Sequence, residues 1–520
     1  MARKREISYY NGRYKGSLSD NTCQILDTLS EVDLVGDLTH CIYDLPKSAV
    51  ELIKETYRST GMPPLDLFKP IGTLKPMQTV GVAYMYWAGT MILGDSVGLG
   101  KTVQTAGLCN ILKAENEKLG KPFRYLLLTE KTLIEEIGDK MIEFTGDYVC
   151  ILGGEKRDSE KFISMYPDGT DCSVVGSHTL FNQPLFVSWL MSCSEFPFDL
   201  IVVDESSVLG NLSTQISKNA KIVLDQFKRR IFLNATPFES KLNIFYSQLH
   251  LLDGTLLPAK YVFEKEYFVY DYSGMYPKHK GRYKNEAEFK RLVGYHYFAR
   301  TRNENGAEMI DCTADILLSP LTPKQKSMIP KTQMWRMVCD CPNYFEPELD
   351  FNMETVPKLA SIKTLLEGDF SEAESIIIFT LYTETQYSLS DWLNEIGWTN
   401  GILNGKVTNI RDKNDIIRRF KNKEFKVLIT SVQKGLDFGS CNHCIFFSFD
   451  PNPQKMVQME GRITREFDIV NKHVRLLCSE GREYAYLDKV VRLRANAGSN
   501  FTKVDSSCIM SLLLGGDSGE

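Results

Sequence analysis

Short apolar runs alternate with longer amphipathic stretches from residue 74 to residue 252. The apolar runs are Met91–Leu93, Tyr125–Leu128, Ser173–Val175, Leu200–Val203 and Arg230–Leu233. Short runs separated by stretches with helical periodicity are typical of parallel strands that are buried in a sheet and linked by helices. The pattern therefore predicts an α/β lobe with a parallel sheet over residues 71–252.

The same rhythm returns in the second half of the chain, after an aromatic, basic and loop-rich segment. The strands predicted there are Ile376–Phe379, Val427–Thr430, Cys444–Phe447 and Val474–Leu477. We therefore expect two parallel-sheet α/β lobes. The predicted regions are an N-terminal accessory region (1–70), a first lobe (71–252), an inter-lobe insertion and brace (253–355), a second lobe (356–495) and a C-terminal tail (496–520).

Composition narrows the class of protein but does not select a substrate. The 520 residues are 43% hydrophobic and 24% charged, with a net charge of −5, so the chain is not globally basic. No apolar run approaches the ~18–20 residues of a membrane span, and no apolar signal-peptide core follows the basic N-terminus. The 13 cysteines form no obvious metal-ligand pattern and fit reduced thiols. We expect an intracellular protein with no membrane partner.

A glycine-rich segment, Gly94–Thr102, lies between the first apolar run and a helical pattern. In such a strand–turn–helix context, backbone N–H groups and the helix N-terminus cradle phosphates. Lys101 is predicted to reach the β- and γ-phosphates, and the Thr102 hydroxyl is predicted to bind Mg²⁺. Asp95 stands where the strict phosphate-loop pattern has its first glycine. The candidate nucleotide contacts of the loop are Asp95, Ser96, Val97, Gly98, Leu99, Gly100, Lys101 and Thr102.

Two adjacent carboxylates follow the apolar run Leu200–Val203. Asp204 and Glu205 are expected at the carboxyl edge of the parallel sheet, where α/β proteins bind ligands. Asp204 is suited to hold Mg²⁺, and Glu205 is suited to polarise the attacking water. A solvated loop is the alternative for an isolated Asp-Glu pair, but the preceding phosphate loop favours a catalytic role. These features predict an ATPase.

The form D-x-x-G-L-G-K-T resembles the nucleotide loop of the Swi/Snf branch of superfamily-two helicase-like motors. Other motifs of that family occur in its usual order. Leu74–Gln78, with Gln78, lies upstream of the loop. Downstream are Ile231–Phe238 with Thr236, Val427–Phe438 with Gly435 and Asp437, and Gln458–Arg465 with Arg462 and Arg465. The resemblance implies two RecA-like lobes. It also implies that Gln78 pairs with adenine and that Thr236, Gly435 and Asp437 contribute to the nucleotide site. Arg462 and Arg465 would then act as arginine fingers.

This sequence departs from the family pattern at two of these motifs. Ser206-Ser207 follows Glu205 where the family usually has Ala-His or Gly-His, and Glu466-Phe467 follows the second arginine where Gly-Gln is common. The first departure concerns the coupling between nucleotide and nucleic acid rather than hydrolysis.

Candidate nucleic-acid contacts lie in polar loops at the ends of predicted strands and between the lobes. Hydroxyl and lysine side chains at strand ends suit phosphate contacts, which position a protein without reading sequence. The candidates are Lys131, Ser177, His178, Thr179, Arg300, Arg302, Thr430 and Ser431. Generic polar loops are the alternative at most of them. The basic and aromatic residues between the lobes either track a backbone and stack on bases or brace the lobes.

The resemblance implies an ATP-dependent, Mg²⁺-requiring translocase that moves along or remodels duplex or branched DNA. A DNA or RNA helicase that separates strands is one alternative. An ATP-gated DNA-binding scaffold with little turnover is another, which intact Lys101, Glu205 and Arg465 disfavour. We expect a monomer that acts in a bacterial cytoplasm or, if virus-encoded, in a host cytoplasm. Residues 1–70 are the candidate surface for a protein partner.

Overall fold

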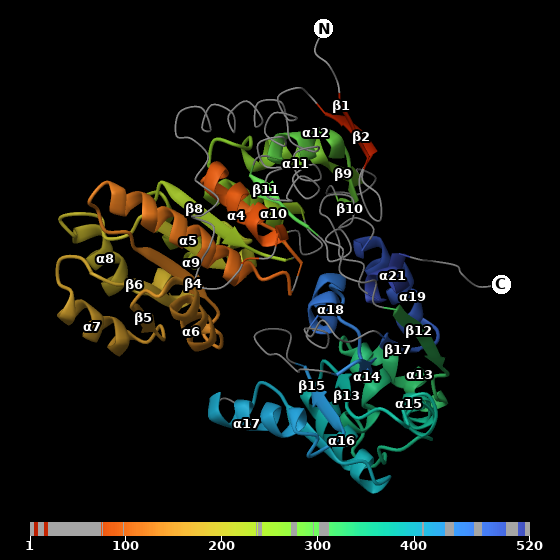
Figure 1. Ribbon diagram of the computed structural model, residues 1–520. Coiled ribbons are helices and arrows are strands. Elements are labelled where there is room, and N and C mark those ends of the chain that lie inside the picture. The colour runs from red at the N-terminus through yellow and green to blue at the C-terminus, as the bar shows by residue number, and fades with distance from the viewer. Residues whose placement is uncertain are drawn as a thin grey trace. The chain divides into compact units, whose positions relative to one another are not determined.

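The chain folds into two compact units, each built on its own sheet (Figure 1). The first unit contains residues 1–307 and 500–505, and the second contains residues 308–499 and 506–520. The computed structural model describes residues 5–8, 15–18, 74, 76–96, 98–235, 237, 242–271, 278–294, 296–300, 311–407, 410–431, 441–461, 471–495 and 508–514.

The first unit contains a seven-stranded sheet in which every strand pair is parallel. Its strand order is β11-β3-β8-β7-β4-β6-β5. The strands are β3 (Thr90–Leu93), β4 (Tyr125–Thr129), β5 (Val149–Leu152), β6 (Ser173–Ser177), β7 (Leu200–Asp204), β8 (Arg229–Leu233) and β11 (Tyr297–Phe298). The five predicted strands of this lobe are therefore confirmed, and β5 and β11 are additional strands.

Helices cover both faces of this sheet because alternate strand residues point to opposite sides. One core combines residues of α4 (Pro76–Ala88), α5 (Lys101–Lys118) and α6 (Ile134–Thr145) with strand residues such as Leu127 and Val202. Their neighbours Leu128 and Val203 pack in the opposite core. The elements of that second core are α7 (Lys156–Met165), η3 (His178–Asn182), α8 (Pro184–Ser192), η4 (Ser206–Leu209), α9 (Gln215–Leu224), α10 (Leu242–Leu252), α11 (Lys260–Tyr267) and α12 (Glu286–Val293).

The second unit contains a six-stranded, all-parallel sheet of order β12-β17-β16-β13-β15-β14. Its strands are β12 (Asp311–Ser319), β13 (Ile376–Phe379), β14 (Asn400–Leu403), β15 (Val427–Thr430), β16 (His443–Phe446) and β17 (Asn471–Ser479). Its helices are α13 (Pro323–Met328), η6 (Ile329–Lys331), α14 (Trp335–Asp340), η7 (Pro342–Tyr344), α15 (Lys358–Glu367), α16 (Thr383–Glu395), α17 (Ile410–Lys421), α18 (Pro453–Glu460), α19 (Arg482–Tyr486), η8 (Leu487–Val491) and α21 (Cys508–Leu514). The predicted α/β fold with two parallel-sheet lobes is thus confirmed.

The predicted inter-lobe segment, residues 253–355, contributes strands to both sheets. β11 pairs with β3 of the first sheet, whereas β12 pairs with β17 of the second. Before both of them in the chain, β9 (Phe268–Asp271) and β10 (Lys278–Tyr283) form an antiparallel hairpin of the first unit. Phe289 and Phe298 lie in the hydrophobic core, so these two aromatic residues brace the lobe and are not exposed platforms for bases.

Two smaller features complete the described structure. β1 (Arg5–Ser8) and β2 (Lys15–Leu18) form an antiparallel hairpin within the predicted accessory region. Nine described cysteines are free, whereas Cys508 is disulfide-bonded, so the expectation of reduced thiols is wrong for Cys508.

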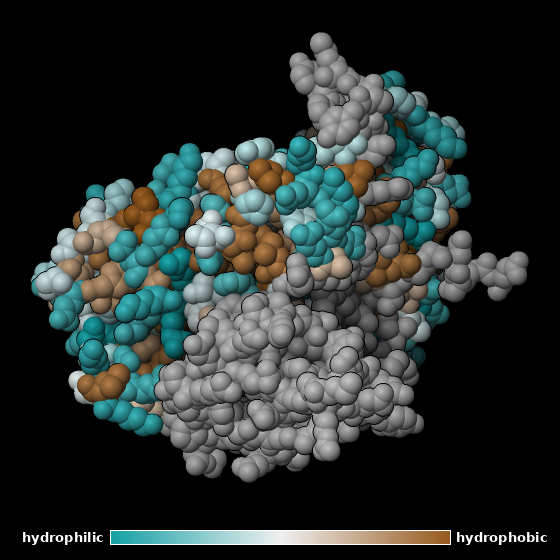
Figure 2. Space-filling view, turned by 90° about the horizontal axis from the view of Figure 1, so that it is seen from above, coloured by the Kyte–Doolittle hydropathy of each residue, from teal (hydrophilic) through white to brown (hydrophobic). Residues whose placement is uncertain are grey.

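On the face shown in Figure 2, hydrophobic residues are interspersed with hydrophilic ones. Among the helices that the structure describes, none combines the length and the apolar character needed to cross a bilayer.

Candidate nucleotide site

The glycine-rich loop connects β3 directly to α5, as the sequence predicts. β3 ends at Leu93 and α5 begins at Lys101, so the helix N-terminus directly follows the loop. Gly100 has a left-handed backbone conformation, with φ of 78°, and a Cβ atom there would lie 2.3 Å from Gln78 Nε2. Only glycine meets both conditions without strain. The loop can therefore turn sharply and present its N–H groups at the start of an 18-residue helix.

Lys101 is held by the carbonyl groups of its own loop. Its Nζ donates to the backbone oxygens of Asp95 at 2.6 Å and Ser96 at 3.3 Å. Carbonyl oxygens bind an ammonium group more weakly than phosphate oxygens, because charge-assisted bonds between two ions are stronger. A triphosphate could therefore draw the ammonium group away from these carbonyls. Thr102 follows in the first turn of α5 and is half-buried.

Strand register brings the loop and the paired carboxylates to the same edge of the sheet. β8 lies between β3 and β7, and its last residue, Leu233, pairs with both Leu93 and Asp204. Because the strands are parallel, the phosphate loop and Glu205 follow the carboxyl ends of β3 and β7, which lie at the same edge of the sheet with only β8 between them. The predicted meeting of these motifs at the ligand-binding edge therefore agrees with the register.

Asp204 is a buried carboxylate whose surroundings favour its protonated form. Burial, followed by the charge of Glu205, raises the pKa of Asp204 to about 6. The positive charge of Lys101 and a hydrogen bond from Thr129 Oγ1, at 3.0 Å, oppose that rise. A carboxylate with a raised pKa at the carboxyl edge of a parallel sheet is a candidate for a functional position. The charge effect also indicates that Lys101 and Asp204 belong to one site.

Glu205 has a strained backbone, with φ of 46° in the left-handed region. Side chains other than glycine rarely adopt this region, which costs about 1–3 kcal/mol and recurs at active sites. The strain directs the chain from β7 into η4 immediately after Asp204. The contacts on both sides of Glu205 maintain this turn.

A buried amide that sequence reasoning missed supports this turn. Gln248 of α10 accepts hydrogen bonds from Ser206 Oγ at 2.7 Å and from Asn234 Nδ2 at 3.0 Å. Its Nε2 donates to the Pro237 carbonyl at 2.7 Å. Gln248 thus joins the ends of β7 and β8 through the serine that replaces the small residue of the family pattern. The sequence shows only a glutamine in a helix that also contains Asn243, Ser247 and His250, and the fold buries it.

The donor set fits Mg²⁺ better than a structural metal centre. Mg²⁺ prefers oxygen ligands, keeps several waters and uses one or two carboxylates together with substrate phosphates. Asp204 and the Thr102 hydroxyl supply such oxygens. Within the described residues, no group of three or more His, Cys, Asp or Glu side chains could hold a metal ion.

Asp95 and Arg300, two predicted ligand contacts, form an ion pair with each other. Asp95 is fully buried and Arg300 is 2% exposed, and their charged groups approach to 2.5 Å. The Asp95 carboxylate is thus bound by Arg300, and the Asp95 backbone carbonyl receives Lys101. The predicted contacts of Asp95 with nucleotide and of Arg300 with nucleic acid stay predictions. A sequence alone does not distinguish a buried arginine from an exposed one, and here the buried carboxylate required a cation.

The predicted nucleic-acid residues divide into buried and exposed groups. His178 is buried and its Nε2 donates to the Asp204 carbonyl at 2.7 Å. Ser177 accepts from Thr179 N at 3.3 Å, and Thr430 donates to the Leu403 carbonyl at 2.8 Å. These three side chains are buried and bonded within the fold, and their predicted contacts with nucleic acid stay predictions.

The side chains of Lys131 and Thr179 are exposed, and Ser431 is half-buried, so these three residues stay candidates for nucleic-acid contacts. Gln78 is buried beside the loop, where Nε2 donates to the Leu99 carbonyl at 3.4 Å. Its predicted adenine contact stays a prediction. The predicted site residues that lie outside the described residues are Val97, Thr236, Arg302, Gly435, Asp437, Arg462 and Arg465.

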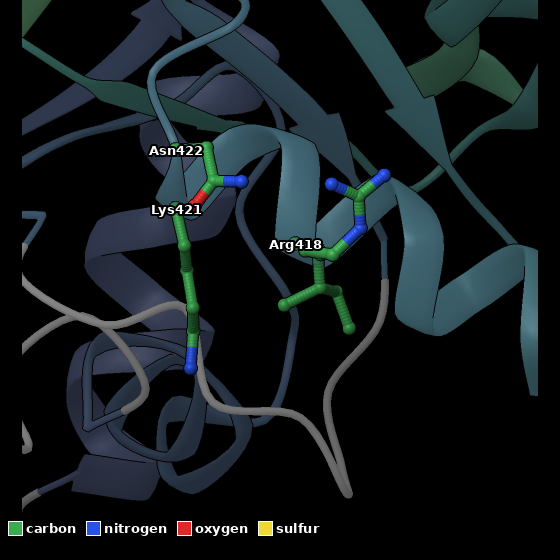
Figure 3. A pocket seen from close by; sticks show the side chains of 4 residues that line it. Arg418, Lys421 and Asn422 are labelled. Atoms are coloured by element: carbon green, nitrogen blue, oxygen red, sulfur yellow. The ribbon is translucent and has the colours of Figure 1, made fainter.

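A hollow of about 310 Å³ lies on α17 of the second unit. Ile417, Arg418, Lys421 and Asn422 line it, and Figure 3 shows the three polar side chains at the end of this helix. Arg418 pairs with Asp415 at 2.6 Å and approaches Glu424 at 3.7 Å. Neighbouring carboxylates thus balance its charge, and we assign no ligand to this hollow.

Two family models match the chain, in the order of the two units. The SNF2-related domain matches residues 77–337, and the helicase conserved C-terminal domain matches residues 357–466. The first match covers half of the chain and contains the phosphate loop, Asp204 and Glu205.

Curated relatives share low identity over most of this chain. A chromodomain-helicase-DNA-binding protein 1-like of Mus musculus is 23% identical over 75% of this chain and 45% of its own length. A DNA repair and recombination protein RAD54B of Gallus gallus is 21% identical over 82% and 54%. An uncharacterized ATP-dependent helicase YqhH of Bacillus subtilis (strain 168) is 23% identical over 72% and 70%. The chain thus spans about half the length of the two vertebrate relatives.

Among solved structures, the Sulfolobus solfataricus SWI2/SNF2 ATPase core in complex with dsDNA is similar, with 19% identity and a TM-score of 0.40. The comparison covers 79% of this chain and 88% of that chain.

Proposed function

Because this chain belongs to the SNF2-related family, we propose that it is an ATP-driven translocase that moves along or remodels double-stranded or branched DNA. The observation that carries the proposal is the meeting of the phosphate loop with Asp204 and Glu205 at one sheet edge. Both the lysine and the carboxylate that hydrolysis requires are present there. The same fold without this lysine and this carboxylate would support only the binding of a nucleotide, not its hydrolysis.

In the proposed reaction, water attacks the γ-phosphorus of ATP and the β–γ anhydride bond breaks to give ADP and phosphate. Lys101 leaves the loop carbonyls and neutralises the β- and γ-phosphate oxygens. Glu205 orients the attacking water and receives its proton, a role that its fixed backbone supports. Mg²⁺, when held by Thr102 and Asp204, would neutralise further phosphate charge. On sequence grounds, Arg462 and Arg465 are proposed to contribute to the same neutralisation.

DNA is the proposed track, because the family and the names of the relatives both favour it. One relative is named as DNA-binding and another as a DNA repair and recombination protein. Exposed Lys131 and Thr179, and half-buried Ser431, are candidate phosphate contacts on this chain, as is Arg302, which lies outside the described residues. Partners beyond DNA are proposed only for residues 1–70.

The test is the steady-state ATPase rate of the full chain without nucleic acid and with single-stranded DNA, duplex DNA, forked DNA or RNA. We expect the largest stimulation with duplex or forked DNA. Stimulation by RNA alone would favour a strand-separating RNA helicase and would overturn the proposal. DNA binding with no turnover in any of these conditions would favour the ATP-gated scaffold.

A further inference from the structure

Arg300 is among the largest fully buried side chains of the described residues, and it contacts the first residues of the phosphate loop. Its Nε donates to Asp95 Oδ1 at 3.1 Å, and its Nη2 donates to Asp95 Oδ2 at 2.5 Å. Its backbone N–H also donates to Asp95 Oδ1, at 3.0 Å. Two parallel bonds between a guanidinium and a carboxylate fix both distance and orientation. Asp95 is thus held more rigidly than a single ion contact would hold it.

Gln104 extends this contact from the beginning of the loop to its end. Its Nε2 donates to Asp95 Oδ2 at 3.0 Å and to the Leu99 carbonyl at 3.2 Å. Its Oε1 accepts from Arg300 Nη2 at 3.0 Å. Since Gln104 lies on α5, the guanidinium, the two ends of the loop and the helix form one buried hydrogen-bonded cluster.

The backbone around Arg300 fixes the same part of the loop. The Arg300 carbonyl accepts from Ser96 N at 3.0 Å, and the Phe298 carbonyl accepts from Gly94 N at 2.6 Å. Space around the cluster is filled, because a Cβ atom at Gly81 would lie 1.8 Å from Gln104 Oε1 and 2.8 Å from Arg300 Nη2. The carbonyls of Asp95 and Ser96, which hold Lys101, are therefore placed by contacts of Arg300.

We propose that Arg300 is a positioning residue that holds the phosphate loop in its nucleotide-binding geometry and thereby sets the affinity for ATP. The inference rests on the proposed function and deepens it. Arg300 also neutralises the Asp95 carboxylate, which otherwise would be a buried anion within a loop that must accept a triphosphate. Loss of the guanidinium would both loosen the loop and oppose the ligand's negative charge.

The experiment measures the Kd of the full chain for a fluorescent ATP analogue with Mg²⁺, in the wild type, Arg300→Gln, Asp95→Asn and the double variant. We expect Arg300→Gln to raise the Kd at least about tenfold, which is about 1.4 kcal/mol of binding free energy. The double variant removes both charges, so we expect a smaller rise than in Arg300→Gln. At saturating ATP, kcat should change less than KM, because the guanidinium does not contact the reacting atoms.

Asp340→Asn is the matched control, since Asp340 forms an equally buried ion pair with Lys358 in the second unit. Melting curves establish that each variant is folded. If Arg300→Gln does not fold, Arg300→Lys, which keeps the charge without the fork, is measured instead and should raise the Kd above that of the wild type. An unchanged Kd in folded Arg300→Gln or Arg300→Lys would overturn the inference, as would an equal rise in Asp340→Asn. If the wild type binds no ATP, the proposed function itself fails.

Discussion

Each unit of this protein buries a carboxylate against a cation, but the two clusters support different parts of the molecule. In the first unit, Arg300 and Asp95 join the phosphate loop to the backbone that follows β11. In the second, Lys358 lies 2.7 Å from Asp340 and 2.9 Å from Glu483. That cluster connects α14, α15 and α19, which contain no predicted nucleotide contact.

The second cluster is built to satisfy its own charges. Ser448 Oγ donates to Asp340 Oδ2 at 2.7 Å, and Ser479 N donates to Glu483 Oε2 at 2.7 Å. Burial opposes the charge of Lys358, but Asp340 and Glu483 outweigh it and raise its pKa. Burial also raises the pKa of Asp340, to about 6, against the opposing effect of Lys358. Loss of the second cluster should therefore lower the free energy of unfolding, whereas loss of the first cluster should weaken ligand binding.

The largest expected effect is on turnover, in the first unit. Lys101→Ala or Glu205→Gln should lower kcat by at least about 10³-fold, or about 4 kcal/mol of barrier, because each removes a group that acts in the transition state. Steady-state ATPase assays with duplex DNA measure this effect. Lys118→Ala, an exposed lysine on the same helix, is the control and should retain wild-type turnover. Normal hydrolysis in either site variant would show that the site assignment is wrong.

The next effect is on the stability of the second unit. Lys358→Met leaves Asp340 and Glu483 buried without their cation and should lower the free energy of unfolding by about 3–5 kcal/mol. Urea unfolding followed by fluorescence measures the loss, and the Kd for ATP of the folded protein should stay within about twofold. A large rise in Kd without destabilisation would contradict the division between the two clusters.

A smaller effect concerns Asp204 and pH. Its folded-state pKa, about 6, is above the ordinary 3.8, so the folded state binds the proton more tightly than the unfolded chain. Stability should therefore fall as pH rises from about 4 to 6, by about 3 kcal/mol at full effect. Asp204→Asn should remove this loss and raise the urea midpoint of the ligand-free protein at pH 7, while hydrolysis is abolished. A variant that is less stable than the wild type at pH 7 would refute this assignment.

The smallest expected effect is at an exposed ion pair. Lys131 lies 3.1 Å from Glu155, and Lys131→Ala should change the free energy of unfolding by less than about 0.5 kcal/mol. If Lys131 contacts a DNA phosphate, the slope of log affinity against log salt should become shallower by about 0.9. Lys156→Ala, in the exposed pair with Glu160, is the control. Equal slopes for both variants and the wild type would exclude Lys131 from the DNA contact.

Local patterns allowed most of the fold and part of the site to be predicted. Apolar runs predicted most strands of both sheets, and the segment from Gly94 to Thr102 predicted the loop with its strand and helix. The resemblance to the Swi/Snf family is confirmed by the family match. These features depend on residues that are close in sequence, or on motifs whose order is preserved.

The burial of individual polar side chains, and their contacts with residues far away in the sequence, could not be predicted from local patterns. Arg300 and Asp95 are 205 positions apart, so neither residue indicates the other, and both were assigned to a ligand because charged residues are usually exposed. Gln248 is one of several polar residues of α10, so its sequence context does not indicate its partners. His178 follows a strand and was expected at a surface, although its ring reaches the Asp204 carbonyl. These roles arise only when the sheet brings strand ends together.

ATP hydrolysis at the sheet edge of the first unit is proposed to drive movement along duplex DNA. Displacement of a labelled third strand from a duplex, by the wild type and by Glu205→Gln, measures that movement. We expect displacement by the wild type only, and only with hydrolysable ATP. Rapid duplex-stimulated hydrolysis without any displacement would contradict it, as would equal displacement by Glu205→Gln.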